Sequence, residues 1–483
     1  MRNMLSPVSA AALGLAIAAL AAGPCGAATL QALATFNGSN GNAPNGGLIG
    51  DAAGNLFGTT EVGGGASLGT VFVIAKTIGG YANMPTTLVD FSSFDGASGR
   101  FPAGGLIADF NGNLFGTTKF GGPLTAGTVY EVIKSAGGYA ATPTLLASFS
   151  GANGTGANPV GSLFADTHGN LFGATVAGGT SNNGTVFEIR KDPKFGFLVP
   201  ITLVSFSGSD GAQPVGSLIA DANGNLFGTT AAGGINNNGT VFEIVNTANG
   251  YATTPALLAA FHGPDGSAPE GGLILDANGN LFGTTTAGGM TPTGGTNIYG
   301  TVFELVKTPN GYASTLTTLV SFNSTDGSFP TGSLILDAKG NLFGTTATGG
   351  DRNLGTAFKI AKTANGYATT PTVVVSFNRL ADGLDPSGGL IADTAGNLFG
   401  AAGEGGANHD GTVFAITGSG FAPPLTFAGR PGRAHCFGDS MLALQRHGNL
   451  DTAARARGFR DAEALQTAIL RYCRPVRAAA ARY

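Results

Sequence analysis

The chain has 483 residues, of which 82 are glycine and only 11% are charged, and its formal net charge is −4. Such a glycine content without the three-residue period of collagen indicates either disorder or an all-β fold with many tight turns. Because 42% of the residues are hydrophobic and 32 are phenylalanine, the chain can bury a large core, so its composition favours a folded protein over a disordered one.

Residues 1–28 have the pattern of a secretory signal peptide. Arg2 gives a basic start, residues 8–22 are small and apolar, and residues 26–28 (Gly-Ala-Ala) suit signal peptidase. An apolar run of this length is too short to span a membrane, and Pro24 directly before Cys25 argues against a lipoprotein anchor. We therefore expect a mature protein that begins near residue 29 and is secreted or periplasmic.

A repeat occupies most of the remaining chain. The sequence Gly-Asn-Leu-Phe-Gly occurs seven times, beginning at Gly54, Gly112, Gly169, Gly224, Gly279, Gly340 and Gly396. These copies are 55 to 61 residues apart, and a period of this length indicates a solenoid, a propeller or an array.

The fourth copy shows which secondary structure fills the repeat. Apolar, β-prone runs predict strands over residues 216–221, 225–230, 239–244 and 256–261, and Asn223-Gly224 predicts a tight hairpin turn between the first two. No run has apolar residues at helical spacing. Four short antiparallel strands per unit are typical of a propeller blade, so the sequence predicts an all-β, seven-bladed β-propeller over residues 29–429.

The two ends of the propeller compete for one position. Residues 30–36 resemble the fourth strand of a blade but lack their own first three strands, whereas the seventh unit has three strands and needs a fourth. Residues 424–427 also resemble a fourth strand. We expect the N-terminal strand to complete the seventh blade and close the ring.

The repeat resembles a known family. The pattern Gly-Gly-Leu-Ile-x-Asp-x-x-Gly-Asn-Leu-Phe-Gly-Thr-Thr, followed by Gly-Gly and then Gly-Thr-Val-Phe-Glu-Ile, is similar to the GloVer tandem repeat of secreted bacterial proteins, and more distantly to NHL-type propeller repeats. The resemblance covers about four fifths of the chain. It implies an extracellular propeller, often followed by a surface anchor, but no sorting motif with a membrane helix is present here.

Residues 430–483 form a segment of different composition. They hold ten arginines against four acidic residues, and their runs of Ala, Leu, Gln and Arg predict two or three short helices. In an exported protein, Cys436 and Cys473 are expected to form a disulfide. The positive charge suits either an anionic lipid, polysaccharide or nucleic acid, or the acidic propeller itself, or simply a solvated helical face.

Two acidic motifs recur in the repeats and could suggest a metal or catalytic site, but a comparison of the copies argues against this. The Asp-x-x-Gly-Asn motif resembles a calcium loop, but its third position includes Ala53 and Lys339, so we expect Asp and Asn to shape a turn. Four glutamates recur at one repeat position, which suits an architectural role: Glu131, Glu188, Glu243 and Glu304. The histidines are scattered, and we expect no metal site, no cofactor and no catalytic motif.

The loops that join the second and third strands hold the candidate ligand residues. These loops lie on the same face of a propeller as the connections between blades. The candidates are the charged residues that break the repeat there: Glu61, Lys119, Asp351, Arg352, Glu404, His409 and Asp410. Glu61, Lys119 and Glu404 belong to blades that become neighbours when the ring closes.

From these patterns we expect a secreted, non-enzymatic binding or scaffold protein that recognises a glycan or an extracellular protein through its loops. We expect a monomer with no nucleic-acid partner. Two alternatives stay open, because fold alone does not decide function. One is a propeller enzyme such as a lactonase, glycan lyase or hydrolase, and the other is a purely structural envelope protein.

Overall fold

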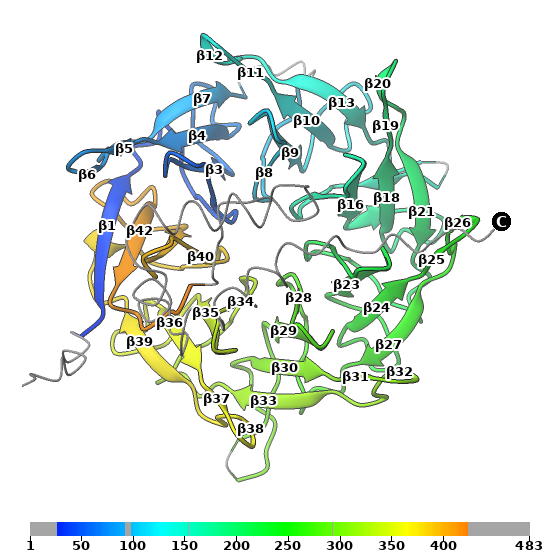
Figure 1. The fold of residues 1–483 in the computed structure, drawn as a ribbon, viewed down its shortest axis with the longest axis vertical. Helices are drawn as coiled ribbons and strands as arrows, with labels where there is room; N and C mark the ends of the chain where they lie inside the picture. Colours follow the sequence, from blue (N-terminus) through cyan, green and yellow to red (C-terminus); the bar gives the residue numbers. More distant parts are fainter. Residues whose placement is uncertain (1–26, 92–97, 153, 292, 424–483) are drawn as a thin grey trace, which may run out of the picture.

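The computed structural model describes residues 27–91, 98–152, 154–291 and 293–423. Within them, seven four-stranded antiparallel sheets stand around a central axis (Figure 1), which confirms the predicted seven-bladed propeller. Residues 1–26 of the proposed signal peptide, residues 424–427 and the basic segment with Cys436 and Cys473 lie outside the described residues. The disulfide and the helical tail therefore stay predictions.

Each blade is built from four strands that follow one another in the chain, except that the last blade takes its outer strand from the N-terminus. The blades comprise β2 (Ile49–Gly50), β3 (Leu56–Thr60), β4 (Thr70–Ile74) and β7 (Thr86–Asp90); β8 (Ile107–Ala108), β9 (Leu114–Thr118), β10 (Thr128–Val132) and β13 (Thr144–Ser148); β15 (Phe164–Ala165), β16 (Leu171–Thr175), β18 (Thr185–Ile189) and β21 (Ile201–Ser205); β22 (Ile219–Ala220), β23 (Leu226–Thr230), β24 (Thr240–Ile244) and β27 (Ala256–Ala260); β28 (Ile274–Leu275), β29 (Leu281–Thr285), β30 (Thr301–Leu305) and β33 (Thr317–Ser321); β34 (Ile335–Leu336), β35 (Leu342–Thr346), β36 (Thr356–Ile360) and β39 (Thr372–Ser376); and β40 (Ile391–Ala392), β41 (Leu398–Ala402), β42 (Thr412–Thr417) and β1 (Thr29–Thr35).

Shorter elements decorate the blades. The first six blades each carry a small hairpin between their third and fourth strands, which the sequence did not predict. The six hairpins are β5 (Lys76–Thr77) with β6 (Gly80–Tyr81), β11 (Lys134–Ser135) with β12 (Gly138–Tyr139), β19 (Lys191–Asp192) with β20 (Gly196–Phe197), β25 (Asn246–Thr247) with β26 (Gly250–Tyr251), β31 (Lys307–Thr308) with β32 (Gly311–Tyr312), and β37 (Lys362–Thr363) with β38 (Gly366–Tyr367). The other short elements are the strand pair β14 (Gly156–Ala157) and β17 (Ala177–Gly178), and the 3-10 turn η1 (Leu380–Asp382).

The glycine in the middle of each second strand has a steric reason. In the fourth blade, Gly228 pairs directly with Phe242 of the third strand. A Cβ on Gly228 would lie 2.6 Å from the Phe242 ring and 2.9 Å from the side chain of Leu218. The glycine therefore lets the phenylalanine ring pack closely against the second strand, where it is fully buried.

Aromatic contacts between neighbouring blades recur around the ring. A phenylalanine at the end of each fourth strand packs on the third strand of the next blade, as Phe206 does on Phe242 with ring centroids 5.0 Å apart. A second contact joins each small hairpin to the preceding blade, as Tyr312 packs edge-to-face on Phe227 at 5.5 Å. Because each core cluster takes residues from two adjacent blades, no blade has a complete core of its own.

The N-terminal strand closes the ring, as predicted. β1 pairs with β42 from Thr29 opposite Thr417 to Thr35 opposite Thr412. Phe36 continues this strand and packs on Phe72 of the first blade at 5.0 Å. In the last blade, which has no small hairpin, Phe421 packs on Phe343 at 5.1 Å and takes the place of the hairpin tyrosine.

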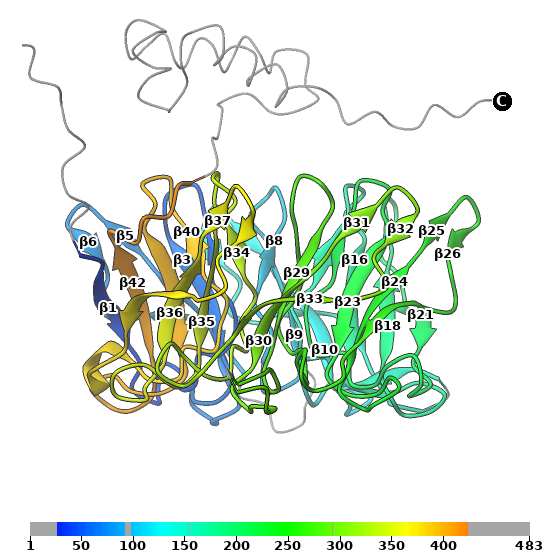
Figure 2. The same ribbon diagram turned by 90° about the horizontal axis from the view of Figure 1, so that it is seen from below.

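The two faces of the ring differ in structure. Figure 2 shows the small hairpins, such as β25–β26 and β31–β32, on one side, which we call the hairpin face. The opposite side, the loop face, carries the loops between second and third strands and the connections between blades. Among the described residues, no helix is long and apolar enough to span a bilayer.

Candidate functional site

A cavity of about 1120 Å³ lies on the axis of the ring and is lined by residues of all seven blades. Its wall is a repeated pair of small residues just before each first strand: Gly46-Gly47, Gly104-Gly105, Gly161-Ser162, Gly216-Ser217, Gly271-Gly272, Gly332-Ser333 and Gly388-Gly389. The first member must be glycine, because the blades converge here. A Cβ on Gly104 would lie 2.6 Å from the carbonyl oxygen of Gly161.

A left-handed residue shapes the entrance to this cavity on the loop face. In every blade the residue before a proline has a positive φ, between +52° and +59°, although none of the seven is glycine. Its carbonyl accepts a hydrogen bond from the residue after the second strand, as Ala43 does from the amide of Glu61. Backbone strain of this kind persists only where surrounding contacts hold it. Here the residue after the proline lines the cavity in all seven blades.

Three of the seven residues predicted from the sequence line this cavity. Glu61, Lys119 and Glu404 lie on its wall, in the first, second and last blades. The ring closure therefore brings together three side chains that are up to 343 residues apart in the chain. The remaining four predicted residues do not line the cavity.

Those four lie elsewhere on the loop face. Asp351 and Arg352 are exposed in the loop between β35 and β36, and His409 is exposed in the loop between β41 and β42. Asp410 is half-buried, and its Oδ1 accepts a hydrogen bond from Nδ2 of Asn42 at 2.6 Å. This bond joins the last blade to the first, so Asp410 contributes to ring closure.

The cavity also contains polar residues that the sequence did not single out. Asp385 is the left-handed residue of the last blade, while Asn45 and Glu270 directly follow the prolines of the first and fifth blades. The corresponding positions hold Ala103, Val160, Val215, Thr331 and Ser387 in the other blades. A comparison of the residues beside each proline, copy by copy, would have revealed this variation.

Asn45 links the carboxylate of Glu61 in the first blade to the hydroxyl of Ser387 in the last blade. Its Nδ2 donates to Oε2 of Glu61 at 3.2 Å, and its Oδ1 accepts a hydrogen bond from Oγ of Ser387 at 3.5 Å. The space for this side chain exists because the residue after the second strand is Gly403 in the last blade, whereas two of the other blades have an alanine there and four have a larger residue. A Cβ on Gly403 would collide with Oδ1 of Asn45.

Burial and charge repulsion act on two acids of the cavity. Burial, and then the neighbouring Glu404 carboxylate, raise the pKa of Asp385 above its ordinary value. Burial likewise raises the pKa of Glu270, and the hydroxyl of Thr286 partly offsets this. Within the described part of the chain, neither these acids nor Glu61 form an ion pair, and no group of three His, Cys, Asp or Glu side chains is arranged to hold a metal ion.

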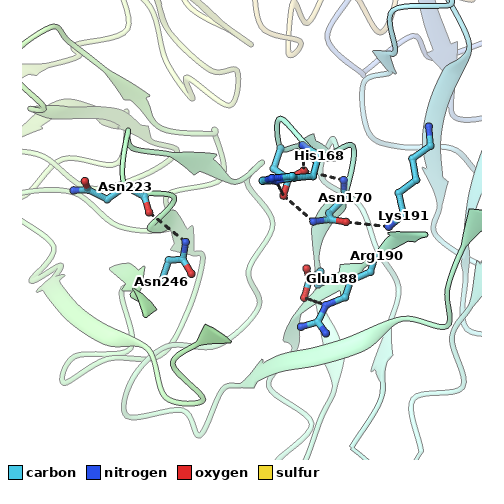
Figure 3. A network of polar contacts seen from close by, with 8 residues as sticks. His168, Asn170, Glu188, Arg190, Lys191, Asn223 and Asn246 are labelled. Carbon is cyan, nitrogen blue, oxygen red and sulfur yellow. Dashed lines mark hydrogen bonds and ion pairs between the residues drawn. The ribbon is translucent and has the colours of Figure 1, made fainter. Parts of the chain in front are cut away.

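The repeated aspartates on the hairpin face are occupied by their own turns. In the third blade, Oδ1 of Asp166 accepts the amides of His168 and Asn170 at 2.8 and 2.9 Å, and Oδ2 accepts Nδ2 of Asn170. Asn170 in turn accepts the amide of Lys191 at the base of the small hairpin (Figure 3). These bonds show the aspartate and asparagine shaping the turn.

The repeated glutamates lie on the third strands, between neighbouring blades. Glu188 is buried and accepts a hydrogen bond from Nε of Arg190 at 3.0 Å (Figure 3). Burial raises the pKa of Glu243, while Lys307 from the hairpin of the next blade lowers it. These glutamates lie outside the central cavity.

Comparisons with known proteins place the chain in a family. A model of the Gloeobacter/Verrucomicrobia repeat matches residues 23–155, 93–294 and 289–458. No curated protein sequence gives a significant match.

Two solved structures are similar to this chain at low sequence identity. The extracellular domain of a protein assigned as a hybrid two-component system from B. thetaiotaomicron is 10% identical, with a TM-score of 0.50 over 83% of this chain and 41% of that one. This chain thus spans less than half of that structure. The PQQ-bound aldose sugar dehydrogenase from Streptomyces coelicolor is 12% identical, with a TM-score of 0.41 over 80% of this chain and 98% of that one. Because the three segments matched by the repeat model together include all seven blades, the chain belongs to the Gloeobacter/Verrucomicrobia repeat family.

Proposed function

We propose that this chain is a secreted, non-enzymatic binding protein that takes a saccharide into the cavity on its loop face. The observation that carries the proposal is the loss of sevenfold symmetry at the cavity entrance. Polar and charged side chains gather on the last, first and second blades, as Asp385, Glu404, Asn45, Glu61 and Lys119. Elsewhere the blades are nearly uniform, so this is where the ring presents one specific chemistry.

The opposite part of the wall suits the apolar face of a sugar ring. Apart from Glu270, the third to sixth blades contribute no charged residue to the wall, where uncharged polar residues such as Asn158, Thr331 and Asn353 alternate with apolar ones. The apolar residues are Val160, Val176, Val215, Phe329, Ala347 and Leu354. Ligand sites combine such apolar surface with a few oriented polar groups and commonly measure about 300–1,000 Å³. A cavity of about 1120 Å³ has room for an oligosaccharide end, whereas a protein partner would need a broad open surface.

Isothermal titration calorimetry of the full chain against neutral, acidic and amino oligosaccharides tests this proposal. We expect binding that weakens about tenfold in Lys119→Ala, because a charged hydrogen-bond donor to a sugar hydroxyl is lost. Lys76→Ala is the matched control, since Lys76 lies on the hairpin face over the ring of Tyr81. No binding by any saccharide class, or equal loss in both variants, would overturn the proposal.

A hydrolase or lyase acting on glycans is the second candidate. It is favoured by the pair Asp385 and Glu404, because two carboxyl groups in unlike environments can divide acid and base roles. Chromatography of the incubated oligosaccharides separates the two candidates. Cleaved product that disappears in Asp385→Asn supports the enzyme, whereas intact ligand supports binding alone.

A further inference from the structure

The cavity has an excess of negative charge that the protein itself does not neutralise. Four carboxyl groups line its wall, those of Glu61, Glu270, Asp385 and Glu404, against the single ammonium group of Lys119. None of the four forms an ion pair with a lysine, arginine or histidine of the described residues. Because unpaired carboxylates in a partly desolvated site are unfavourable, a positively charged ligand group would gain from this wall.

Three of these acids form one continuous arrangement across the seam where the ring closes. The amide of Glu404 donates to the carbonyl of Leu384, next to Asp385, and the amide of Gly403 donates to the carbonyl of Asp385. Asn45 then connects Ser387, two residues after Asp385, to Glu61 of the first blade. The acids thus lie on neighbouring backbone segments of one wall.

The seam is built specifically for this arrangement. Asn45 stands where other blades have Ala103 or Val160, and its amide fixes the Glu61 carboxylate. Gly403 leaves the volume that Asn45 needs. Both departures from the repeat serve to hold carboxylates at the cavity entrance, and neither is required by blade packing, since the other six blades manage without them.

We propose that the saccharide bound in this cavity carries a protonated amino group, which docks against the carboxylates of Glu61, Asp385 and Glu404. This inference rests on the proposed saccharide-binding function and names its ligand class as amino sugars. The remaining hydroxyl groups of the ligand face Lys119 and the apolar wall. Hydrogen bonds between an ammonium group and carboxylates are shorter and stronger than those between neutral groups, so the amino group supplies the selectivity.

A matched set of three trisaccharides tests the inference by titration calorimetry on the full chain. Glucosamine, N-acetylglucosamine and glucose trimers with β-1,4 links differ only in the group on C2, which is an ammonium, an acetamide or a hydroxyl. We expect the glucosamine trimer to bind at least about tenfold more tightly than either of the others. Because attraction between charges is screened, this preference should fall as salt is added.

Asp385→Asn and Glu404→Gln should each weaken binding of the glucosamine trimer several-fold more than they weaken binding of the glucose trimer. Asp351→Asn is the control, since Asp351 lies on the loop face outside the cavity. Equal or tighter binding of the neutral trimers would overturn the amino-sugar inference and keep the saccharide-binding function. Failure of all three trimers to bind, while another saccharide binds, would overturn the inference alone, and failure of every saccharide would overturn both.

Discussion

Substitution of Phe36 by alanine tests whether the N-terminal strand closes the ring. Phe36 has no exposed surface, and its ring packs edge-to-face on Phe72 across the seam at 5.0 Å. Truncation of a buried phenylalanine to alanine costs about 3–5 kcal/mol, through lost burial and the cavity that is left. With an unfolding entropy of about 2.1 cal/mol/K per residue, that cost lowers Tm by roughly 4–6 °C for a propeller of this size.

Differential scanning calorimetry of Phe36→Ala and two companions completes the test. Phe206→Ala is the matched control. Phe206 makes the same fully buried contact with Phe242, but between two blades that follow one another in the chain. We expect equal decreases in Tm for the two variants and little change for Phe427→Ala. A Tm within about 1 °C of the parent for Phe36→Ala, with a large decrease for Phe427→Ala, would refute closure by β1.

Three further predictions concern single sites. Gly228→Ala should lower the free energy of unfolding by about 1–3 kcal/mol in urea titrations, because its Cβ meets the ring of Phe242, whereas Gly79→Ala, with open space around it, should not. Asp221→Ala should lower Tm by the same amount in calcium and in EDTA, because its carboxylate holds only its own turn; a calcium-dependent difference in the parent protein would contradict this. Asp385→Asn should become more stable relative to the parent as pH rises from 3.8 through the raised pKa of Asp385. In this range the carboxyl group loses its proton more readily in the unfolded parent than in the native parent, which lowers the free energy of unfolding of the parent only. A stability difference that is constant with pH would contradict the assigned burial.

Much of the fold could be predicted because the repeat that forms one blade occurs seven times in the sequence. The expected strands of the fourth copy agree with β23, β24 and β27 to within one residue. The first strand is shorter than expected, since β22 covers only Ile219–Ala220. The preceding Gly216-Ser217 lies against the next blade at the axis, and this contact depends on the curvature of the whole ring. The small hairpins were missed because two-residue strands leave no alternating pattern in the sequence.

The candidate site was harder to predict, because its residues depend on backbone geometry around a proline. The residue before proline normally avoids helical conformations, and nothing in the sequence indicates that Asp385 adopts a φ of +56°. That conformation turns the adjoining positions toward the axis. Charge alone therefore identified Glu61, Lys119 and Glu404 but also selected Asp351 and His409, which lie away from the cavity.

The seam between the last and first blades is the place where a closed repeat protein can acquire a specific site at low cost to its fold. Every other interface joins blades that are consecutive in the chain, and its residues repeat a common packing solution. At the seam, the two sides come from opposite ends of the propeller, so a change such as Asn45 or Gly403 affects one interface only. The hydrogen bond between Asn42 and Asp410 joins the same two blades and contributes to ring closure. A ligand that contacts both Glu61 and Glu404 would therefore stabilise the closed ring, because it would hold together the N-terminal and C-terminal parts of the chain, which are otherwise joined by non-covalent contacts such as the pairing of β1 with β42.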